Sequence, residues 1–349
     1  MYNMGMKDLW THLKETQKPI VLYGMGNGAD KIISVLNTYD IKISGVFASD
    51  GFVREKIFHG FKVTDYKTAK QTFGDMVVLV CFGSSLPDVI ANIKRIATEQ
   101  ELYAPDVPVY GNVLFNMQYV LENKESLEWV YNRLSDDASK QVFKNAVMYK
   151  LTGKIEYLFE CETPINEIYQ NILKFDNDEV YFDLGAYRGD TVEEFLSACK
   201  DYKKIIAVEP DKKTYNKLCL ATENVTNIEN INACVSDIDG QIEFEMNGSR
   251  GSTIGKGRDL ITSITIDALS KKEIPTYIKM DIEGAEVSAI IGGANTIKQY
   301  KPQMQIAAYH RSEDLILIPQ KILNIRKDYK IYLRHFPSLP CWDMSYYFI

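Results

Sequence analysis

The chain has 349 residues, 46% of them hydrophobic and 25% charged, which is ordinary for a globular protein and excludes a fibrous or disordered one. Its length suits two domains better than one, because single hydrophobic cores stop growing near ~250–300 residues. The net charge of −7 argues against nucleic-acid or anionic-membrane partners. We see no leader peptide, no apolar run of the ~20 residues that span a membrane and no closely spaced cysteines, so we expect a cytoplasmic protein with reduced thiols.

Short apolar runs alternate with amphipathic stretches in the first third of the chain. Strands alternating with helices indicate parallel pairing in a doubly wound sheet, so we assign residues 1–111 to a Rossmann-like domain of the nucleotide-binding type. The elements expected there are strands at 20–23, 43–47, 76–82 and 107–110, and helices at 29–36 and 86–96.

Three glycines, Gly24, Gly26 and Gly28, follow the first of these strands and precede a helix. This is the context of a nucleotide-binding turn, and Asp50 after the next strand is a possible ribose partner. A scaffold with no ligand is the other interpretation. The stretch 20–65 resembles the N-terminal domain of sugar acetyltransferases and nucleotide-sugar-modifying enzymes, which implies a nucleotide-sugar or related ligand.

Residues 112–175 carry apolar residues at helical spacing and predict a helical connector. A second alternating series follows and predicts another doubly wound α/β domain at 176–349, with a parallel sheet that ends in an antiparallel hairpin. The expected strands are 180–184, 205–209, 228–235, 241–246, 277–281 and 303–309, with hairpin segments at 330–336 and 345–349.

The first turn of this second series contains Asp183, Gly185 and Gly189, and Glu209 ends the next strand. Ligands of open α/β sheets bind beyond the carboxyl ends of the strands, and an acidic residue after the second strand can accept both hydroxyls of a ribose. The alternative is that Glu209 only caps a helix. A dinucleotide would need backbone amides around its pyrophosphate, whereas this acidic turn with its x-Gly-x-x-x-Gly spacing suits the cationic S-adenosylmethionine better.

Two further strand ends carry candidate catalytic residues. Lys279, Asp281 and Glu283 alternate along one strand and so share one side of it, while Glu286 more simply stabilises the dipole of the next helix. His310 follows another strand, and its ordinary pKa suits proton removal, so we rank it ahead of Asp281 and Glu283 as the base. These three side chains could also hold a divalent cation, although we assign no metal site.

Five ordered motifs resemble FkbM-family methyltransferases: DLGAYRGD at 183–190, VEPD at 208–211, NACVSDIDG at 232–240, IKMDIEGAE at 278–286 and KPQMQIAAYH at 301–310. The resemblance covers about 175–349. It implies a class I methyltransferase fold, S-adenosylmethionine as methyl donor and a hydroxyl acceptor on sugars or natural products. It also implies that Asp183, Gly185 and Gly189 line the cofactor turn, that Glu209 holds the ribose and that Asp237 lies near the adenine. Tyr187 stands where many members have Asn or His.

We therefore expect an S-adenosylmethionine-dependent O-methyltransferase that acts on a hydroxyl of a saccharide, nucleotide-sugar or related metabolite. Two alternatives come from other classes. The chain could be a non-catalytic module that binds a nucleotide or S-adenosylmethionine for regulation. It could also be a nicotinamide-dependent oxidoreductase that uses the N-terminal glycine turn.

Overall fold

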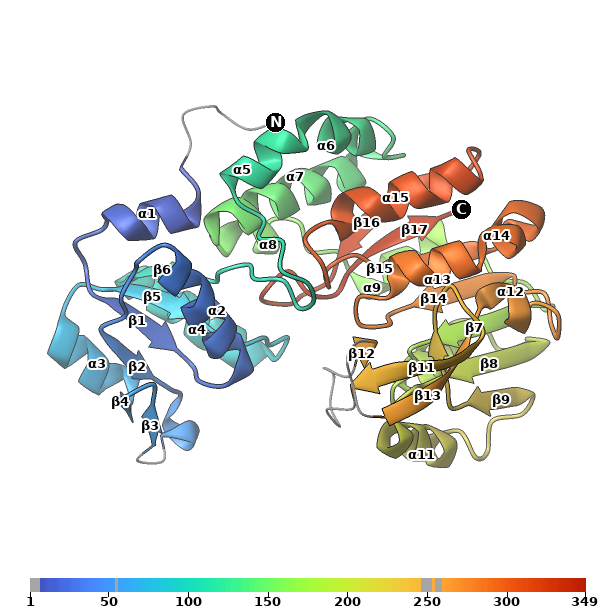
Figure 1. The fold of residues 1–349 in the computed structure, drawn as a ribbon, viewed down its shortest axis with the longest axis horizontal. Coiled ribbons are helices and arrows are strands. Elements are labelled where there is room, and N and C mark those ends of the chain that lie inside the picture. The colour runs from blue at the N-terminus through green and yellow to red at the C-terminus, as the bar shows by residue number, and fades with distance from the viewer. Residues whose placement is uncertain (1–6, 54–55, 246–252, 255–258) are drawn as a thin grey trace.

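The computed structural model describes residues 7–53, 56–245, 253–254 and 259–349. The fold is mixed α/β, with mostly parallel sheets and helices on both faces, as predicted (Figure 1). Across these residues, no helix is both long and apolar enough to cross a membrane.

The N-terminal sheet has six strands in the order β3-β4-β2-β1-β5-β6. The β3–β4 pair is antiparallel, whereas β4, β2, β1, β5 and β6 pair in parallel. Both faces of β1 and β5 are buried, as expected of the apolar runs IVLY and VVLV in a parallel sheet. The strands are β1 (Ile20–Tyr23), β2 (Gly45–Phe47), β3 (Ile57–Phe58), β4 (Phe61–Thr64), β5 (Val77–Val80) and β6 (Glu101–Tyr103).

Alternate residues of β1 point to opposite faces of this sheet. Ile20 and Leu22 pack with one layer, formed by α1 and α2, and Val21 and Tyr23 pack with the other, formed by α3 and α4. The helices are α1 (Leu9–Glu15), α2 (Asn27–Thr38), α3 (Tyr66–Phe73) and α4 (Pro87–Glu99), and a short 3₁₀ turn, η1, covers Asp50–Phe52.

The prediction of a strand at 107–110 is wrong. Residues 107–110 are not a strand, and Glu101–Tyr103 forms β6 in its place. Pro105 and Pro108 explain the difference, because proline has no N–H to donate to a sheet.

The C-terminal sheet has seven strands in the order β16-β17-β15-β14-β7-β8-β9. Five of them are parallel, and β17 pairs antiparallel with both β15 and β16, which confirms the predicted terminal hairpin. The chain runs outward from β7 to β9 and then returns beside β7 with β14, so the strand order reverses there. The strands are β7 (Val180–Leu184), β8 (Lys204–Val208), β9 (Ile228–Ile231), β14 (Tyr277–Met280), β15 (Gln303–Ala307), β16 (Ile331–His335) and β17 (Met344–Phe348).

Helices cover both faces of this sheet. Tyr181 and Tyr277 pack with α10 and α11, while Phe182 and Ile278 pack with α13, α14 and α15. The helices are α10 (Asp190–Ala198), α11 (Lys212–Ala221), α12 (Ile266–Leu269), α13 (Glu286–Gly292), α14 (Ala294–Tyr300) and α15 (Asp314–Ile325).

A small four-stranded sheet lies beside the main one, in the order β10-β13-β11-β12. The single strand predicted at 228–235 is divided, since Ile228–Ile231 joins the seven-stranded sheet and Cys234–Val235 joins this smaller one. Its strands are β10 (Cys234–Val235), β11 (Gly240–Glu245), β12 (Thr253–Ile254) and β13 (Asp259–Ile264).

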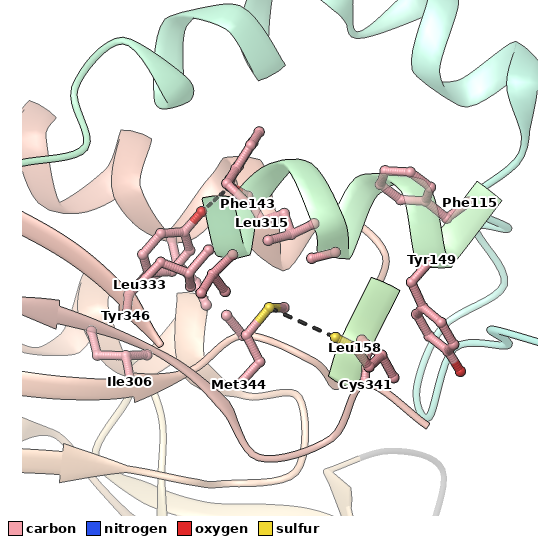
Figure 2. Packing of buried hydrophobic residues seen from close by; sticks show 14 of the residues in the cluster. Phe115, Phe143, Tyr149, Leu158, Ile306, Leu315, Leu333, Cys341, Met344 and Tyr346 are labelled. Atoms are coloured by element: carbon pink, nitrogen blue, oxygen red, sulfur yellow. Dashed lines mark hydrogen bonds between the residues drawn. The ribbon is translucent and has the colours of Figure 1, made fainter. Parts of the chain in front are cut away.

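Helices fill most of residues 117–172, between the two large sheets. They are α5 (Met117–Glu122), α6 (Lys124–Tyr131), α7 (Asp137–Thr152), α8 (Glu156–Phe159), α9 (Ile165–Glu167) and the π-helix η2 (Ile168–Ile172). Figure 2 shows side chains of this region beside the terminal hairpin and α15, where the Tyr346 hydroxyl donates to the Leu315 carbonyl at 2.7 Å.

One hydrophobic cluster runs from the N-terminal sheet through these helices to the C-terminal sheet. The domain limits at 111 and 175 stay a prediction.

A buried ion pair fixes this helical layer to the segment that leaves the N-terminal sheet. Lys150 of α7 lies 3.1 and 3.0 Å from the two carboxylate oxygens of Asp106. Burial alone would lower the pKa of Lys150, but the Asp106 carboxylate outweighs it and keeps the amine charged.

Candidate active site

A cavity of about 520 Å³ opens at the carboxyl ends of β7, β8, β14 and β15. This is the edge at which the strand order reverses, where ligands of open α/β sheets bind. The turn after each of these strands contributes side chains to the wall, and the loop between β16 and β17 closes one side. Ser85, from the loop after β5, reaches the same cavity from the N-terminal sheet.

Asp183 lies at the end of β7, fully buried beneath the cavity. Its Oδ2 accepts a hydrogen bond of 2.5 Å from the Thr191 hydroxyl, while its Oδ1 has no hydrogen-bond partner among the described residues and lies 3.9 Å from Lys279 Nζ. Burial raises the pKa of Asp183 although Lys279 opposes this effect. Asp183 therefore lies at the predicted strand end, but it does not line the cavity.

Gly185 lines the cavity with φ of +85°, and a Cβ there would lie 1.9 Å from the carbonyl oxygen of Asp281. Only glycine lets the turn after β7 pass so close to the end of β14. Gly189, with φ of +92°, is the residue before α10 and does not line the cavity. The two predicted glycines thus shape the turn, and only Gly185 reaches the cavity.

Glu209 lines the cavity just after β8 and is 7% exposed. Its two carboxylate oxygens accept from the backbone N–H of Tyr187 at 3.1 Å and of Asp211 at 2.9 Å. Burial raises its pKa to about 7. The cap of α11 is Asp211, whose side chain accepts from Thr214 N at 2.8 Å. Helix capping therefore does not explain Glu209, whose carboxylate is oriented at the cavity edge.

Asp237 lies apart from the other predicted cofactor residues. Its exposed carboxylate accepts a hydrogen bond of 2.6 Å from the Ser288 hydroxyl, and it does not line the cavity. Ala233, Cys234 and Val235, a few residues earlier, line that side instead. A contact of Asp237 with adenine stays a prediction.

His310 lies among three carboxylates and is 1% exposed. Its Nδ1 is 2.9 Å from Glu286 Oε1, and its Nε2 is 3.4 Å from Asp281 Oδ1 and 3.6 Å from Glu283 Oε2. Neither ring nitrogen makes a hydrogen bond to any described residue, so distance and opposite charge make these contacts ion pairs. Burial alone would lower the pKa of His310, but the carboxylates, Glu286 foremost, raise it to about 10. The imidazole is therefore protonated at neutral pH.

Glu286 has a larger role than the helix-dipole interpretation assigns to it. It is fully buried, and its Oε1 accepts from the backbone N–H of Ile282 at 3.0 Å and of Gly284 at 3.4 Å. The same oxygen faces His310, so this side chain fixes the turn after β14 and the orientation of the imidazole together.

Asp281 and Glu283 both line the cavity, but different features position their side chains. The Tyr309 hydroxyl donates to the Asp281 carboxylate at 3.1 Å. Glu283 has φ of +56°, because β14 ends at Met280 and the chain turns, so the predicted strand-like alternation stops before it. Burial raises the pKa of Glu283 to about 7, and His310 opposes this rise.

A divalent cation fits this cluster poorly. Ligand atoms of Asp281, Glu286 and His310 lie within 4.8 Å of one another. However, Glu286 approaches Nδ1 of the imidazole, while Asp281 and Glu283 approach Nε2. A histidine offers a metal one nitrogen and commonly orients through the other, so Glu286 is placed as an orienting group. The arrangement suits an imidazolium better than a metal ligand.

The N-terminal glycine turn is packed by the protein itself. A Cβ on Gly24 would lie 2.6 Å from the Phe82 ring, and one on Gly28 would lie 2.3 Å from the Cys81 carbonyl oxygen. Gly26 has open space beside it. The side chain of Asp50 lies outside the described part of the structure. A nucleotide site at these four residues stays a prediction.

Several cavity residues were not predicted from the sequence. Tyr309 was detectable in principle, since it immediately precedes His310 at a strand end. Asp343 precedes the last strand, so the strand-end rule does not identify it, and Ser85 follows β5 of the other sheet, so the rule does not assign it to this cavity.

The C-terminal part of the chain is similar to a known protein family. Residues 183–328 match the family model for the methyltransferase FkbM domain, which confirms the predicted resemblance over this range and supports a methyltransferase activity. No curated protein gives a significant match.

Among solved structures, the chain is similar to methyltransferase FkbM from Methylobacillus flagellatus KT, with a TM-score of 0.74 and 23% identity over 97% of this chain and 92% of that one. This similarity shows the fold. Fibrillarin from Aeropyrum pernix, in complex with natively bound S-adenosyl-L-methionine, matches with a TM-score of 0.34 and 12% identity over 50% of this chain and 67% of that one. Precorrin-6y C5,15-methyltransferase from Geobacter metallireducens GS-15 matches with a TM-score of 0.33 and 12% identity over 53% and 85%.

Proposed function

We propose that this protein is an S-adenosylmethionine-dependent O-methyltransferase that acts on a hydroxyl of a saccharide or related metabolite. The observation that carries the proposal is the position of Glu209, a buried carboxylate held by two backbone N–H groups at the edge of the 520 Å³ cavity. A carboxylate at this strand end is placed to accept both hydroxyls of a ribose.

The charges around the cavity favour a cationic ligand over a dinucleotide. Asp190 and Glu194, at the start of α10 and one turn later, both line the cavity. A pyrophosphate would be repelled by these carboxylates at the helix N-terminus where it normally binds. The ammonium and sulfonium groups of S-adenosylmethionine would be attracted to them.

Glu283 is the best placed base for the acceptor hydroxyl. When bound, S-adenosylmethionine supplies an electrophilic methyl group. The acceptor oxygen would take that methyl group, the electron pair of the broken C–S bond would stay on sulfur, and the hydroxyl proton would pass to the base. Glu283 lines the cavity with a pKa of about 7, in the range that suits a general base at neutral pH. His310, first in our sequence-based ranking, is already protonated and is better suited to hold Asp281 and Glu283 in place.

Isothermal titration calorimetry with S-adenosylmethionine tests the donor. We expect saturable binding by the wild type and at least about a tenfold loss of affinity in Glu209→Ala, since hydrogen bonds to a charged group are worth about 1.5–3 kcal/mol each. Glu223→Ala removes an exposed carboxylate just after α11 and serves as the matched control. No binding by the wild type, or equal binding by both variants, would contradict the proposal.

Turnover separates an enzyme from a regulatory module. We expect S-adenosylhomocysteine to accumulate when the protein is mixed with S-adenosylmethionine and a saccharide extract, and to do so equally after chelation with EDTA. Donor binding without any product would favour the non-catalytic alternative. Loss of activity on chelation that Mg²⁺ restores would instead support a divalent cation at Asp281, Glu283 and His310.

A further inference from the structure

Glu283, the proposed base, lies where the two halves of the chain meet. A smaller cavity of about 290 Å³ adjoins the first, and Glu283 lines both. One wall of the smaller cavity is the loop after β5, from Gly83 to Leu86, and the facing wall is the loop between β16 and β17, with Trp342. Ser84 and Leu339 join these two loops through a pair of backbone hydrogen bonds, of 2.7 and 3.0 Å. Glu283 therefore lies beside residues of the N-terminal half as well as beside its own turn.

A segment that leaves the N-terminal sheet, residues 108–113, packs against the turn that holds Glu283; we call this segment the strap. The backbone N–H of Tyr110 donates to the His310 carbonyl at 2.9 Å. Gly284, the residue after Glu283, lies directly against the same tyrosine, since a Cβ on this glycine would be 3.1 Å from both the Cβ and the ring of Tyr110. The strap is thus bonded to the loop after β15 and packed on the turn after β14.

Both ends of the strap are held by side chains. At its start, the Lys31 ammonium of α2 donates to the carbonyl oxygens of Val109 and Pro108, at 2.5 and 3.3 Å. At its end, the Ser312 hydroxyl donates to the Val113 carbonyl at 2.6 Å. Because Lys31 belongs to a helix that covers the N-terminal sheet, that half of the chain helps to set where the strap lies.

Lys31 also acts on Glu283 through its charge. Burial lowers the pKa of Lys31, and the Glu283 carboxylate opposes this effect. Val109, whose carbonyl the ammonium binds, lines the smaller cavity together with Glu283. One side chain of the N-terminal half therefore both holds the strap and places a positive charge near the base.

The hydroxyl of Tyr110 is suited to contact the same carboxylate. It is buried and has no hydrogen-bond partner within the described part of the chain. Burial raises the pKa of Tyr110 and Glu283 raises it further, so the phenol stays neutral and keeps its proton to donate. Glu283 is also the charged group that acts on this hydroxyl most strongly. A buried hydroxyl gains most from an acceptor when that acceptor is charged.

The titratable and charged groups around Glu283 come from both halves of the chain. They are Asp281 and Glu286 from its own turn, Glu209 from the turn after β8, Tyr309, His310 and Arg311 from the loop after β15, Asp343 from the loop between β16 and β17, and Lys31 and Tyr110 from the N-terminal half. Burial and the neighbouring carboxylates raise the pKa of Glu283, whereas His310 and Tyr110 lower it. The Lys31 ammonium, as a nearby cation, also favours the charged form.

We propose, on the basis of the methyltransferase function above, that Lys31 and Tyr110 are positioning residues for Glu283. Lys31 fixes the strap and favours the charged carboxylate. Tyr110, held by the strap, donates its hydroxyl to that carboxylate and so orients the oxygen that takes the acceptor proton. The N-terminal half thereby contributes to catalysis whether or not its glycine turn binds a ligand.

Carbon-13 NMR of the glutamate carboxyl groups tests this positioning without an acceptor. In the full-length protein, Glu283→Gln assigns the signal of Glu283. We expect Tyr110→Phe to raise the pKa of Glu283 from about 7 to about 8, because the charged form loses a hydrogen-bond donor. Lys31→Met should raise it in the same direction, whereas Lys31→Arg keeps the positive charge and should stay close to the wild type. Lys42→Met, at an exposed lysine between α2 and β2, is the matched control and should change nothing.

Turnover gives a second measurement, with the saccharide extract as acceptor and S-adenosylhomocysteine as the product followed. The rising limb of the pH–rate profile should move to higher pH in Tyr110→Phe. At pH 7 the rate should fall about fivefold, because the deprotonated fraction of Glu283 drops from about one half to about one eleventh. The affinity for S-adenosylmethionine, measured by calorimetry, should match that of the wild type.

An unchanged pKa of Glu283 in both Tyr110→Phe and Lys31→Met would overturn the proposal. A loss in Lys31→Arg as large as that in Lys31→Met would also overturn it, as would a parallel loss of S-adenosylmethionine affinity, since either would show a general structural role. A wild type that binds S-adenosylmethionine but forms no product would instead refute the proposed methyltransferase function, and the carboxyl titration would still decide the positioning of Glu283.

Discussion

Glu286→Gln is the substitution that most directly tests the charge state of His310. Glutamine keeps an oxygen to accept from the backbone N–H groups of Ile282 and Gly284, so the turn after β14 should persist. It removes the negative charge 2.9 Å from His310 Nδ1. We expect the pKa of His310 to fall steeply.

The size of the fall follows from the distance. Two unit charges at 2.9 Å attract with about 6 kcal/mol at an effective dielectric constant of about 20, which is about four pKa units. Asp281 and Glu283, at 3.4 and 3.6 Å, still favour the imidazolium in the variant, while burial opposes it. We therefore expect the pKa to drop from about 10 to about 7 or below.

Other groups near the imidazole affect the pKa of His310 less than Glu286 does. Asp314 of α15 is buried, its pKa is raised to about 7 by burial, and Glu286 and His310 act on it in opposite directions. Tyr110 and Tyr309 pack their rings beside His310, and burial raises the pKa of each so that both stay neutral. The Arg311 side chain donates to the Gly284 carbonyl.

Proton–carbon NMR of the histidine ring Cε1 groups against pH measures the change. The chain has four histidines, and His310→Gln assigns the relevant signal. His335 should not interfere, because burial lowers its pKa to about 4. Glu283→Gln, which removes a more distant carboxylate, is the matched control and should lower the pKa of His310 less. A wild-type His310 that titrates near 6.5, or a Glu286→Gln signal that still titrates above 9, would refute the reasoning.

Three further outcomes are expected. Glu283→Gln should lower kcat/KM by about 10²–10⁴, and the wild-type kcat/KM should rise with pH through about 7 as the Glu283 carboxyl loses its proton; a flat pH–rate profile would rule this base out. Gly185→Ala should destabilise the fold by at least about 1–3 kcal/mol in chemical denaturation and weaken donor binding, because its Cβ collides with the Asp281 carbonyl at positive φ. Lys150→Met should cost about 3–5 kcal/mol in the same assay, and adding Asp106→Leu should restore most of it; additive losses would show that the two side chains do not act as a pair.

The strand-end rule explains why much of the cavity was predictable from sequence. Glu209 and Asp281, which line the cavity, and the buried His310 beside them each follow a strand whose apolar run is plain in the sequence, and parallel strands bring their carboxyl ends to one edge. The parallel pairing in the sheet follows from the same alternation, and the antiparallel hairpin from the two final segments that lack a helix between them, whereas the order of the strands does not.

The rest depends on packing that no periodicity reports. Glu286 looks like any acidic residue in a first helical turn, and only its burial against His310 shows its role. The direction of Glu283 depends on a left-handed backbone that begins after β14 ends. Trp342 and Ser85 come together because two loops, from opposite ends of the chain, share backbone hydrogen bonds.

The Ser84–Leu339 junction bears on how such a protein can diverge. Backbone hydrogen bonds do not depend on side-chain identity, so mutations can alter the side chains of both loops while the loops stay joined. The cavity walls that these loops form can therefore change in sequence without any change at Glu209 or Gly185. The same junction ties the two halves together: an excised C-terminal half would keep the turn at Gly185 and the carboxylate of Glu209 but lose the loop after β5, which lines the cavities beside Glu283.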